Sequence, residues 1–291
     1  MTAQTAPRTR VPAVWLVLGG IVSVQFGAAI AKGLFDEVHP TALVWLRLAT
    51  SAVALLLLAR PRVTGRSGRD WMTVVGFGLS LGGMNWAIYQ SFSQIPLGIA
   101  VTLEFIGPLT VAVAGSRRLR DLAWVLLAGA GVVLLGAEPA QLTVAGVLFA
   151  LMAGACWGGY ILLSASTGRR WPGLDGLAVA SVIATALLAP AAFARSDGDF
   201  TDLRILGLGA AVGLLSSVIP YSFEINALRR IRPAVFGILM SLEPAVAALA
   251  AMLVLHEFLS GLQWLAVACV VGASVGATRS SPPSRAEPVP D

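Results

Sequence analysis

The run PLGIAVTLEFIGPL, residues 96–109, carries one acidic side chain, Glu104, and one internal proline, Pro108, in an otherwise apolar stretch. A carboxylate at the centre of a membrane-spanning helix costs about 2.5–3.5 kcal/mol, so such a residue is by default a functional candidate. Proline has no N–H to donate, so Pro108 leaves the carbonyl of Glu104 without its helical partner. The pattern recurs at 241–244, SLEP, where Glu243 precedes Pro244. The two runs predict a membrane protein with two related parts and a polar site between them.

The composition places the whole chain in a membrane. Hydrophobic residues make up 57% of the 291 positions, charged residues only 12%, and the mean hydropathy is +0.81. A soluble domain carries about 25% charged residues. The net charge of +5 comes from arginines that stand in short clusters between apolar runs. Such clusters are typical of membrane topology signals, so nucleic-acid binding is excluded.

Prolines, glycines and arginine clusters divide the chain into ten apolar runs, each close to the length of about 20 residues that a spanning helix needs. The sequence therefore predicts an all-α integral membrane protein with ten transmembrane helices. The predicted spans are 14–35, 40–59, 71–93, 97–115, 122–137, 142–164, 175–194, 204–227, 233–254 and 261–278.

The arginines predict how the chain is oriented. Placing the N-terminus in the cytoplasm puts sixteen arginines on the inner side and only Arg195 and Arg204 on the outer side. Positive charge is enriched in cytoplasmic loops, so both termini are expected in the cytoplasm. Residues 1–13 then form a cytoplasmic tail, and residues 279–291 form a disordered cytoplasmic tail.

An internal repeat relates the two parts of the chain. The run WVLLAGAGVVLLG at 124–136 resembles WLAVACVVGASVG at 264–276, and the glycines at 27 and 154 also align. Residues 14–137 and 142–278 thus form two five-helix repeats. Because five is odd, the second repeat must be inverted relative to the first. Inverted repeats around a midplane site are typical of secondary transporters that work by alternating access.

Several motifs resemble one known family: SLGGMN at 80–85, PLGIAVTLEFIGPL at 96–109, GACWGGYILLS at 154–164, PYSFEINAL at 220–228 and FGILMSLEPAVAAL at 236–249. They are similar to the EamA branch of the drug/metabolite transporter superfamily, most closely to the threonine/homoserine exporters of the bacterial inner membrane. The resemblance extends from about residue 15 to residue 277. It implies a multi-pass, proton-linked antiporter that exports small amino acids without a cofactor, in contact with the lipid bilayer.

Beyond the first residue of each predicted span, five charged residues lie within the spans: Lys32, Arg47, Glu104, Glu224 and Glu243. A zwitterionic substrate needs a cation for its carboxylate and an anion for its ammonium. We expect Glu104 and Glu243 to bind the ammonium or to carry the coupled proton, and Arg47 or Lys32 to hold the carboxylate. The alternatives are a structural ion pair between these groups and, for Lys32, a side chain that extends to the lipid headgroups.

Glu224 is a third candidate for proton coupling. Pro220 in the same run frees the carbonyl of Ser216, which favours a polar site nearby. The alternative is an interfacial salt bridge, because Arg229 and Arg230 follow one turn later.

Three uncharged polar residues within the spans complete the predicted binding site: Gln25, Asn85 and Tyr160. The alternative for each is a hydrogen bond to a neighbouring helix, a contact worth about 0.6 kcal/mol on average in a membrane. The fifth and tenth spans have almost no polar side chains, so they are expected to form a scaffold or the contact surface of a homodimer.

The sequence contains no Walker A motif, no HExxH and no GxSxG, and no metal-ligand spacing. It therefore predicts a transporter and not an ATPase or an intramembrane hydrolase. Two alternatives remain open. One is an exporter of aromatic or other amino acids, or of another metabolite. The other is a membrane sensor or assembly partner that transports nothing.

Overall fold

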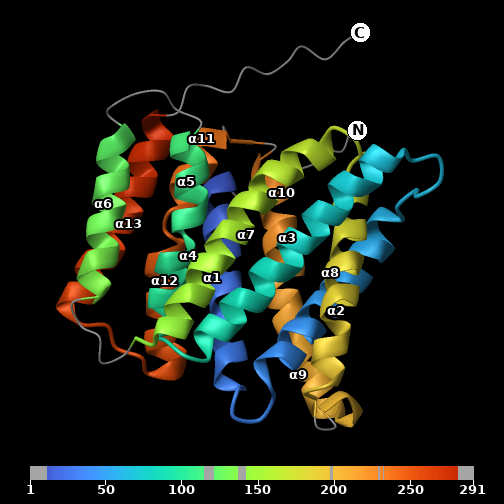
Figure 1. Cartoon of the computed structure of the whole chain (residues 1–291), viewed down its shortest axis with the longest axis horizontal. Helices are drawn as coiled ribbons and strands as arrows, with labels where there is room; N and C mark the ends of the chain where they lie inside the picture. The colour runs from blue at the N-terminus through green and yellow to red at the C-terminus, as the bar shows by residue number, and fades with distance from the viewer. Residues whose placement is uncertain are drawn as a thin grey trace, which may run out of the picture.

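The computed structural model describes residues 12–114, 121–136, 142–196, 199–228, 230–231 and 233–280, and these residues form helices and short connections without any β-strand (Figure 1). Each apolar run predicted above is helical over most of its length. Most of both predicted tails lies outside the described residues. The arginine cluster at 117–120 also lies outside them.

The first part of the chain contains α1 (Ala13–Gly33), α2 (Pro40–Ala59), α3 (Gly68–Phe92), α4 (Leu97–Glu104), α5 (Ile106–Ala114) and α6 (Asp121–Gly136). The second part contains α7 (Val144–Gly168), α8 (Asp175–Phe193), the short η2 (Asp199–Thr201), α9 (Leu203–Gly213), the π-helical turn η3 (Leu214–Val218), α10 (Ile219–Leu228), α11 (Pro233–Met240), α12 (Glu243–Leu255) and α13 (Gly261–Ser280).

Eight helical segments in the described part are long and apolar enough to cross a membrane: Ala13–Gly33, Pro40–Ala59, Leu97–Ala114, Val144–Gly168, Asp175–Phe193, Leu203–Glu224, Val235–Leu255 and Gly261–Arg279. The shorter helix Leu122–Leu135 is also apolar. The chain is therefore a multi-pass membrane protein.

Helix α3 begins earlier than the hydropathy pattern predicted. Ser67 caps it: the Ser67 hydroxyl accepts a hydrogen bond from the Asp70 backbone N–H, and the Asp70 carboxylate accepts one from the Ser67 backbone N–H. This reciprocal capping box satisfies two N–H groups that a helix start leaves without partners. Helix α3 therefore begins at Gly68 instead of residue 71.

Three runs that the sequence presented as single spans contain an interruption. Helices α4 and α5 are separated at Phe105, α11 and α12 at Ser241 and Leu242, and α9 leads into α10 through the π-helical turn η3. Prolines follow each interruption within a few residues, and each proline removes one backbone donor. All three interruptions border the same cavity, which is described below.

Helices from the first part pack mainly on helices from the second part. Helix α3 contacts α7 and α8, α1 contacts α10 and α12, α2 contacts α8 and α9, and α4 contacts α7 and α12. Helices α6 and α13 lie side by side at one edge, and α2, α8 and α9 lie at the opposite edge (Figure 1). The two parts thus interleave around a shared core and do not form two separate bundles.

Helix α7 meets the α4/α5 interruption with its backbone. A Cβ atom on Gly154 would lie 2.5 Å from the carbonyl oxygen of Glu104, and a Cβ atom on Gly107 would overlap the carbonyl oxygen of Gly154. Small residues permit such close packing of helices in membranes. The two glycines therefore fix where α7 crosses the interruption.

Candidate functional site

The first interruption places Glu104 at the last position of α4. The backbone N–H of Leu109 donates to the carbonyl of Phe105 at 3.3 Å, so regular hydrogen bonding resumes after Pro108. Proline at 108 cannot donate to the carbonyl of Glu104, and the backbone of Gly154 lies against that oxygen instead. The same local sequence that ends α4 thus presents the Glu104 carboxylate at the interruption.

The second interruption places Glu243 in the first turn of α12, where Pro244 needs no hydrogen-bond partner. Before it, the Ser241 hydroxyl lies 2.9 Å from the carbonyl of Gly237 and 2.7 Å from the hydroxyl of Ser274 on α13. The partial positive charge of a helix N-terminus stabilises a carboxylate in this position.

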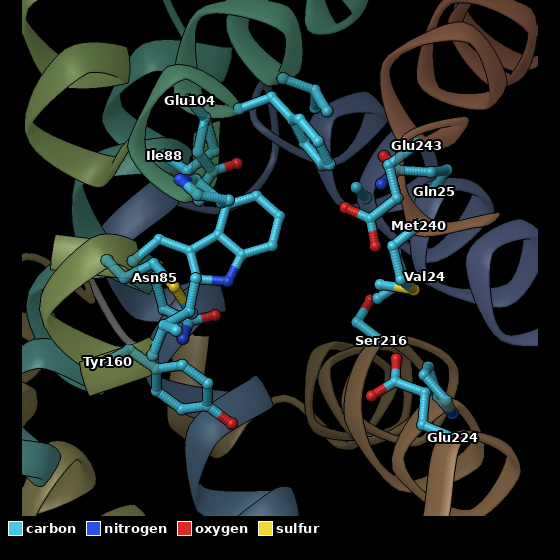
Figure 2. Close-up of a pocket in the computed structure, with 18 of the residues that line it drawn as sticks. Val24, Gln25, Asn85, Ile88, Glu104, Tyr160, Ser216, Glu224, Met240 and Glu243 are labelled. Atoms are coloured by element: carbon cyan, nitrogen blue, oxygen red, sulfur yellow. The ribbon is translucent and has the colours of Figure 1, made fainter. Parts of the chain in front are cut away.

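A cavity of about 500 Å³ lies between these two interruptions. Figure 2 shows Asn85, Ile88, Glu104 and Tyr160 on one wall, and Val24, Gln25, Ser216, Glu224, Met240 and Glu243 on the facing wall. Small-molecule sites commonly measure 300–1,000 Å³ and combine apolar walls with a few polar groups. The volume and the lining are those of a site for a small polar molecule.

Four charged groups line this cavity: the carboxylates of Glu104, Glu224 and Glu243, and the guanidinium of Arg47. Arg47 is close enough to Glu104 to interact with it electrostatically, whereas the charged neighbours of Glu243 are Glu224 and Glu104. Arg47 forms no ion pair within 4.0 Å among the described residues. The predicted structural ion pair between Arg47 and a carboxylate is therefore not present in the described part of the chain.

The π-helical turn positions Arg47. One of its terminal nitrogens donates to the carbonyl of Ser216 at 3.1 Å, and its guanidinium lies 5.7 Å from the centre of the Tyr89 ring. The carbonyl of Ser216 is the one that Pro220 leaves without a helical donor. The proline therefore leaves free an acceptor that holds one arm of Arg47, a residue that lines the cavity.

Three buried polar atoms that belong to cavity-lining residues have no hydrogen-bond partner: Oε1 of Gln25, Nε of Arg47 and Oγ of Ser216. A buried polar group without a partner costs about 1–3 kcal/mol, so such groups are rare outside functional sites. One donor and two oxygens that can accept a hydrogen bond are thus left without partners on residues that line the cavity.

The structure brings together six of the seven predicted substrate-binding residues, namely Gln25, Arg47, Asn85, Glu104, Tyr160 and Glu243, and also Glu224. Asn85 donates to the carbonyl of Leu81 at 2.9 Å, which turns its amide toward its own helix. Arg229, one of the alternative partners of Glu224, lies outside the described residues.

Lys32 lies elsewhere. Its ammonium forms an ion pair with Glu257 at 2.5 Å and donates to the carbonyl of Ile95 at 2.8 Å. Glu257 also accepts a hydrogen bond from the backbone N–H of Leu97, the first residue of α4, at 2.8 Å. Lys32 is not among the residues that line the cavity. It instead ties the end of α1 to the connection between α12 and α13, at the predicted outer surface.

A second ion pair lies near the same surface. Arg204 holds both carboxylate oxygens of Glu37. These hydrogen bonds lower the pKa of the Glu37 carboxyl from its ordinary value. Because both side chains are about half exposed, this pair is screened by salt and stabilises the fold little.

Sequence reasoning missed several lining residues, among them Tyr221, Ser274 and the side chain of Ser216. Tyr221 could have been found, since it follows Pro220 in the run that the sequence singled out. Ser274 had no such signal, because it stands in an apolar helix with no proline or charge beside it. Within the described residues, no group of three or more His, Cys, Asp or Glu side chains could hold a metal ion.

Comparison with known proteins gives a consistent result. Residues 144–279 match the model of the EamA-like transporter family. The chain is 40% identical over 277 residues to the threonine/homoserine exporter RhtA of Salmonella typhimurium, covering 93% of this chain and 94% of the relative. It is 39% identical over 272 residues to RhtA of Escherichia coli K12, covering 91% and 92%.

Two more distant relatives also match this chain, one in sequence and one in fold. An uncharacterized transporter of Bacillus subtilis, YwfM, is 30% identical over 187 residues, which is 60% of this chain and 62% of that protein. A crystal structure of a protein with 20% sequence identity matches the fold with a TM-score of 0.64, covering 91% of this chain and 96% of the other. At that identity the match shows a shared fold alone.

Proposed function

The chain belongs to the EamA-like transporter family, and we propose that it exports a small neutral amino acid, threonine or homoserine, across the bacterial inner membrane. Family membership makes it a transporter and not an enzyme, as the sequence predicted. The relatives named threonine/homoserine exporter match over more than nine-tenths of both chains. The observation that carries the substrate proposal is a single cavity lined by Arg47, by three carboxylates and by residues with unpartnered polar atoms.

The charges in the cavity suit a zwitterion. The substrate carboxylate would bind the guanidinium of Arg47, which is held on one side by the carbonyl of Ser216 and keeps further donors. The substrate ammonium would bind Glu104 or Glu243. The hydroxyl of threonine or homoserine would satisfy the free oxygen of Gln25 or the hydroxyl of Ser216. Hydrogen bonds to charged groups contribute about 1.5–3 kcal/mol each, which makes these contacts the main source of selectivity.

Proton coupling follows from the same carboxylates. A carboxylate must be ionised to hold the substrate ammonium, and it can carry a proton when the site returns empty. Exchange of the ammonium for a proton on Glu104 or Glu243, with Glu224 as a third acceptor along the cavity, makes transport an antiport. In such a cycle the inward proton gradient drives export.

We further propose ten spans in two inverted repeats, 14–137 and 142–278, with both termini in the cytoplasm. Helices α3 and α6 would complete the eight apolar segments. The packing supports this. Exchanging α1 with α7, α2 with α8, α3 with α9–α10, α4 with α11 and α5 with α12 turns the α3/α7 contact into the α1/α10 contact, and the α5/α7 contact into the α1/α12 contact. Helices α6 and α13 pack on each other, and their outward faces would meet lipid or a second copy in a homodimer.

A second candidate substrate class is favoured by one observation. The cavity lining includes Phe105, Trp157, Tyr160, Tyr221 and Phe236. Aromatic walls stack well with aromatic ligands. An exporter of aromatic amino acids therefore remains the alternative to threonine and homoserine. The non-transporting sensor has no comparable support, because the family consists of transporters.

Counterflow in proteoliposomes tests the proposal. Vesicles loaded with unlabelled threonine should accumulate labelled threonine, and vesicles without protein should not. Homoserine should compete with the label, and phenylalanine should not. Effective competition by phenylalanine alone would favour the aromatic alternative. If vesicles that contain folded protein show no uptake of any amino acid, the proposal is wrong. An inward proton gradient should accelerate efflux, and a proton uncoupler should remove this acceleration.

A further inference from the structure

A second cavity of about 230 Å³ lies beside the first, between α3, α7, α8 and α10. It shares three residues with the main cavity: Tyr160, Tyr221 and Glu224. Apart from Phe77 on α3, its other lining residues come from the end of α7, the start of α8 and the connection between them, which the arginine distribution places on the cytoplasmic side. The second cavity therefore adjoins the main cavity on the side from which an exported substrate arrives.

The second cavity contains a polar group that the folded chain does not use. Oγ1 of Thr167 has no hydrogen-bond partner, although Thr167 is only 3% exposed and lines the cavity. Its methyl carbon packs so closely against Gly176 that a Cβ atom there would overlap it. The methyl group of Thr167 therefore packs on α8 at Gly176, while its hydroxyl has no partner within the described residues.

Other hydroxyl groups and one carboxylate complete the lining. Ser164 and the two tyrosines supply hydroxyls, and Glu224 supplies the carboxylate, while Phe77 and Leu177 are apolar. Among the described residues that line this cavity there is no lysine or arginine. It can therefore recognise an ammonium group and a hydroxyl, but it offers no cation to a carboxylate. Arg47 gives the main cavity that additional ability.

We propose that this cavity is a second, entry binding site, which holds the ammonium and hydroxyl of the substrate through Glu224 and Thr167 before the substrate passes to the main cavity. The inference rests on the proposed amino-acid transport. Glu224 borders both cavities, so it can hold the ammonium in the entry site and pass it to Glu104 or Glu243 as the substrate carboxylate moves toward Arg47. The entry site selects amines, and the main cavity selects amino acids among them.

The test uses a reporter cysteine in the entry site. Ser164→Cys is treated with 2-aminoethyl methanethiosulfonate, a small cationic thiol reagent, and modification at residue 164 is read by peptide mass spectrometry, so the native cysteines stay in place. Threonine should slow modification at least about fivefold. Threoninol, which has the amine and hydroxyls but no carboxylate, should protect equally well, and 3-hydroxybutyrate should not protect. Ala165→Cys, on the exposed side of α7, is the matched control and should be modified at the same rate with and without threonine.

Two further variants distinguish binding in the entry site from a structural role of Thr167 and from binding in the main cavity. Thr167→Val removes only the unpartnered hydroxyl, so a purely structural role predicts unchanged protection. We expect the protecting threonine concentration to rise roughly threefold to tenfold, the effect of one lost hydrogen bond. Arg47→Gln weakens the main cavity and should leave protection by threoninol in place.

Each outcome decides a separate point. An entry site is ruled out if residue 164 is never modified, if threoninol gives no protection, or if protection disappears with Arg47→Gln. Wild-type counterflow of threonine in any of these cases leaves the proposed function intact. Absence of counterflow with every amino acid would reject the proposed function. Protection by threoninol would still establish an amine site in the second cavity.

Discussion

The two helix interruptions carry nearly the same residues, a glutamate and a proline in an apolar run, but they place the carboxylate at opposite helix ends. Glu104 is the last residue of α4, whereas Glu243 is in the first turn of α12. A helix dipole stabilises an anion at the N-terminus and not at the C-terminus. The first interruption compensates with a nearby cation, Arg47. The comparison teaches that the spacing between glutamate and proline, four residues in the first run and one in the second, decides which kind of neighbour the carboxylate needs.

The interruptions are also held differently. The first is held by backbone packing between Gly107 and Gly154, and the second by side-chain hydrogen bonds of Ser241 with Gly237 and Ser274. Backbone packing leaves no space for any added atom, whereas a hydrogen bond between side chains can be lost at small cost. The first interruption should therefore be rigid and the second adjustable, which suits a carrier whose two parts must move around a fixed site.

The largest expected effect is that of Gly107→Ala. The new methyl group would overlap the carbonyl of Gly154, so we expect a loss of more than about 3 kcal/mol of stability or no folded protein. Gly237→Ala beside the second interruption is the control, because its Cβ would meet only the tip of Thr278 at 3.1 Å. Thermal unfolding in detergent measures both. Equal stability of the two variants would contradict the contrast between the interruptions.

The next effect concerns the two carboxylates. Because the charged neighbours of Glu243 in the cavity are carboxylates, added positive charge is most stabilised there. We expect Glu243→Gln to weaken threonine binding about tenfold to one hundredfold, the effect of one charge-assisted hydrogen bond, and Glu104→Gln to weaken it less. Equilibrium binding to purified protein distinguishes the two. The reverse order would assign the ammonium to Glu104.

The cations give a third contrast. Arg47 lines the cavity and Lys32 does not, so Arg47→Gln should weaken threonine binding about tenfold or more, by loss of a charged hydrogen bond. Lys32→Gln should leave binding within about twofold. Threoninol, which lacks the carboxylate, should bind the Arg47 variant as well as it binds the wild type. A large loss of threonine affinity in Lys32→Gln would return Lys32 to the binding site.

The smallest effect lies in the hydroxyl pair of the second interruption. Ser241→Ala removes the hydrogen bond to Ser274, and interhelical hydrogen bonds in membranes contribute about 0.6 kcal/mol on average. A double-mutant cycle with Ser274→Ala, measured by unfolding in detergent, should give a coupling energy of about that size. A coupling energy above about 2 kcal/mol would mean that the second interruption is as firmly held as the first.

Much of the site could be predicted from local sequence. Each of Glu104, Glu224 and Glu243 stands within four residues of a proline in an apolar run, and all three line the cavity. Charged side chains and carbonyls without a helical partner must face protein or water when they lie within a bilayer. This requirement can be inferred from the sequence alone. Lys32 obeys the same constraint in another way, since it pairs with Glu257. Because Glu257 is far from Lys32 along the chain, the sequence did not show whether Lys32 would enter the binding site or form an ion pair elsewhere.

The sequence by itself determined that this chain is a multi-pass helical membrane protein and which carbonyls its prolines leave without a helical donor, because hydrophobicity and the missing proline N–H act locally. Only the tertiary structure decided which polar groups share one cavity. The π-helical turn at Leu214–Val218 packs on α2 and holds Arg47 through the carbonyl of Ser216, and the contact between Gly107 and Gly154 sets where α7 crosses α4 and α5. These are distances between segments far apart in the chain, and they depend on how the whole set of helices packs.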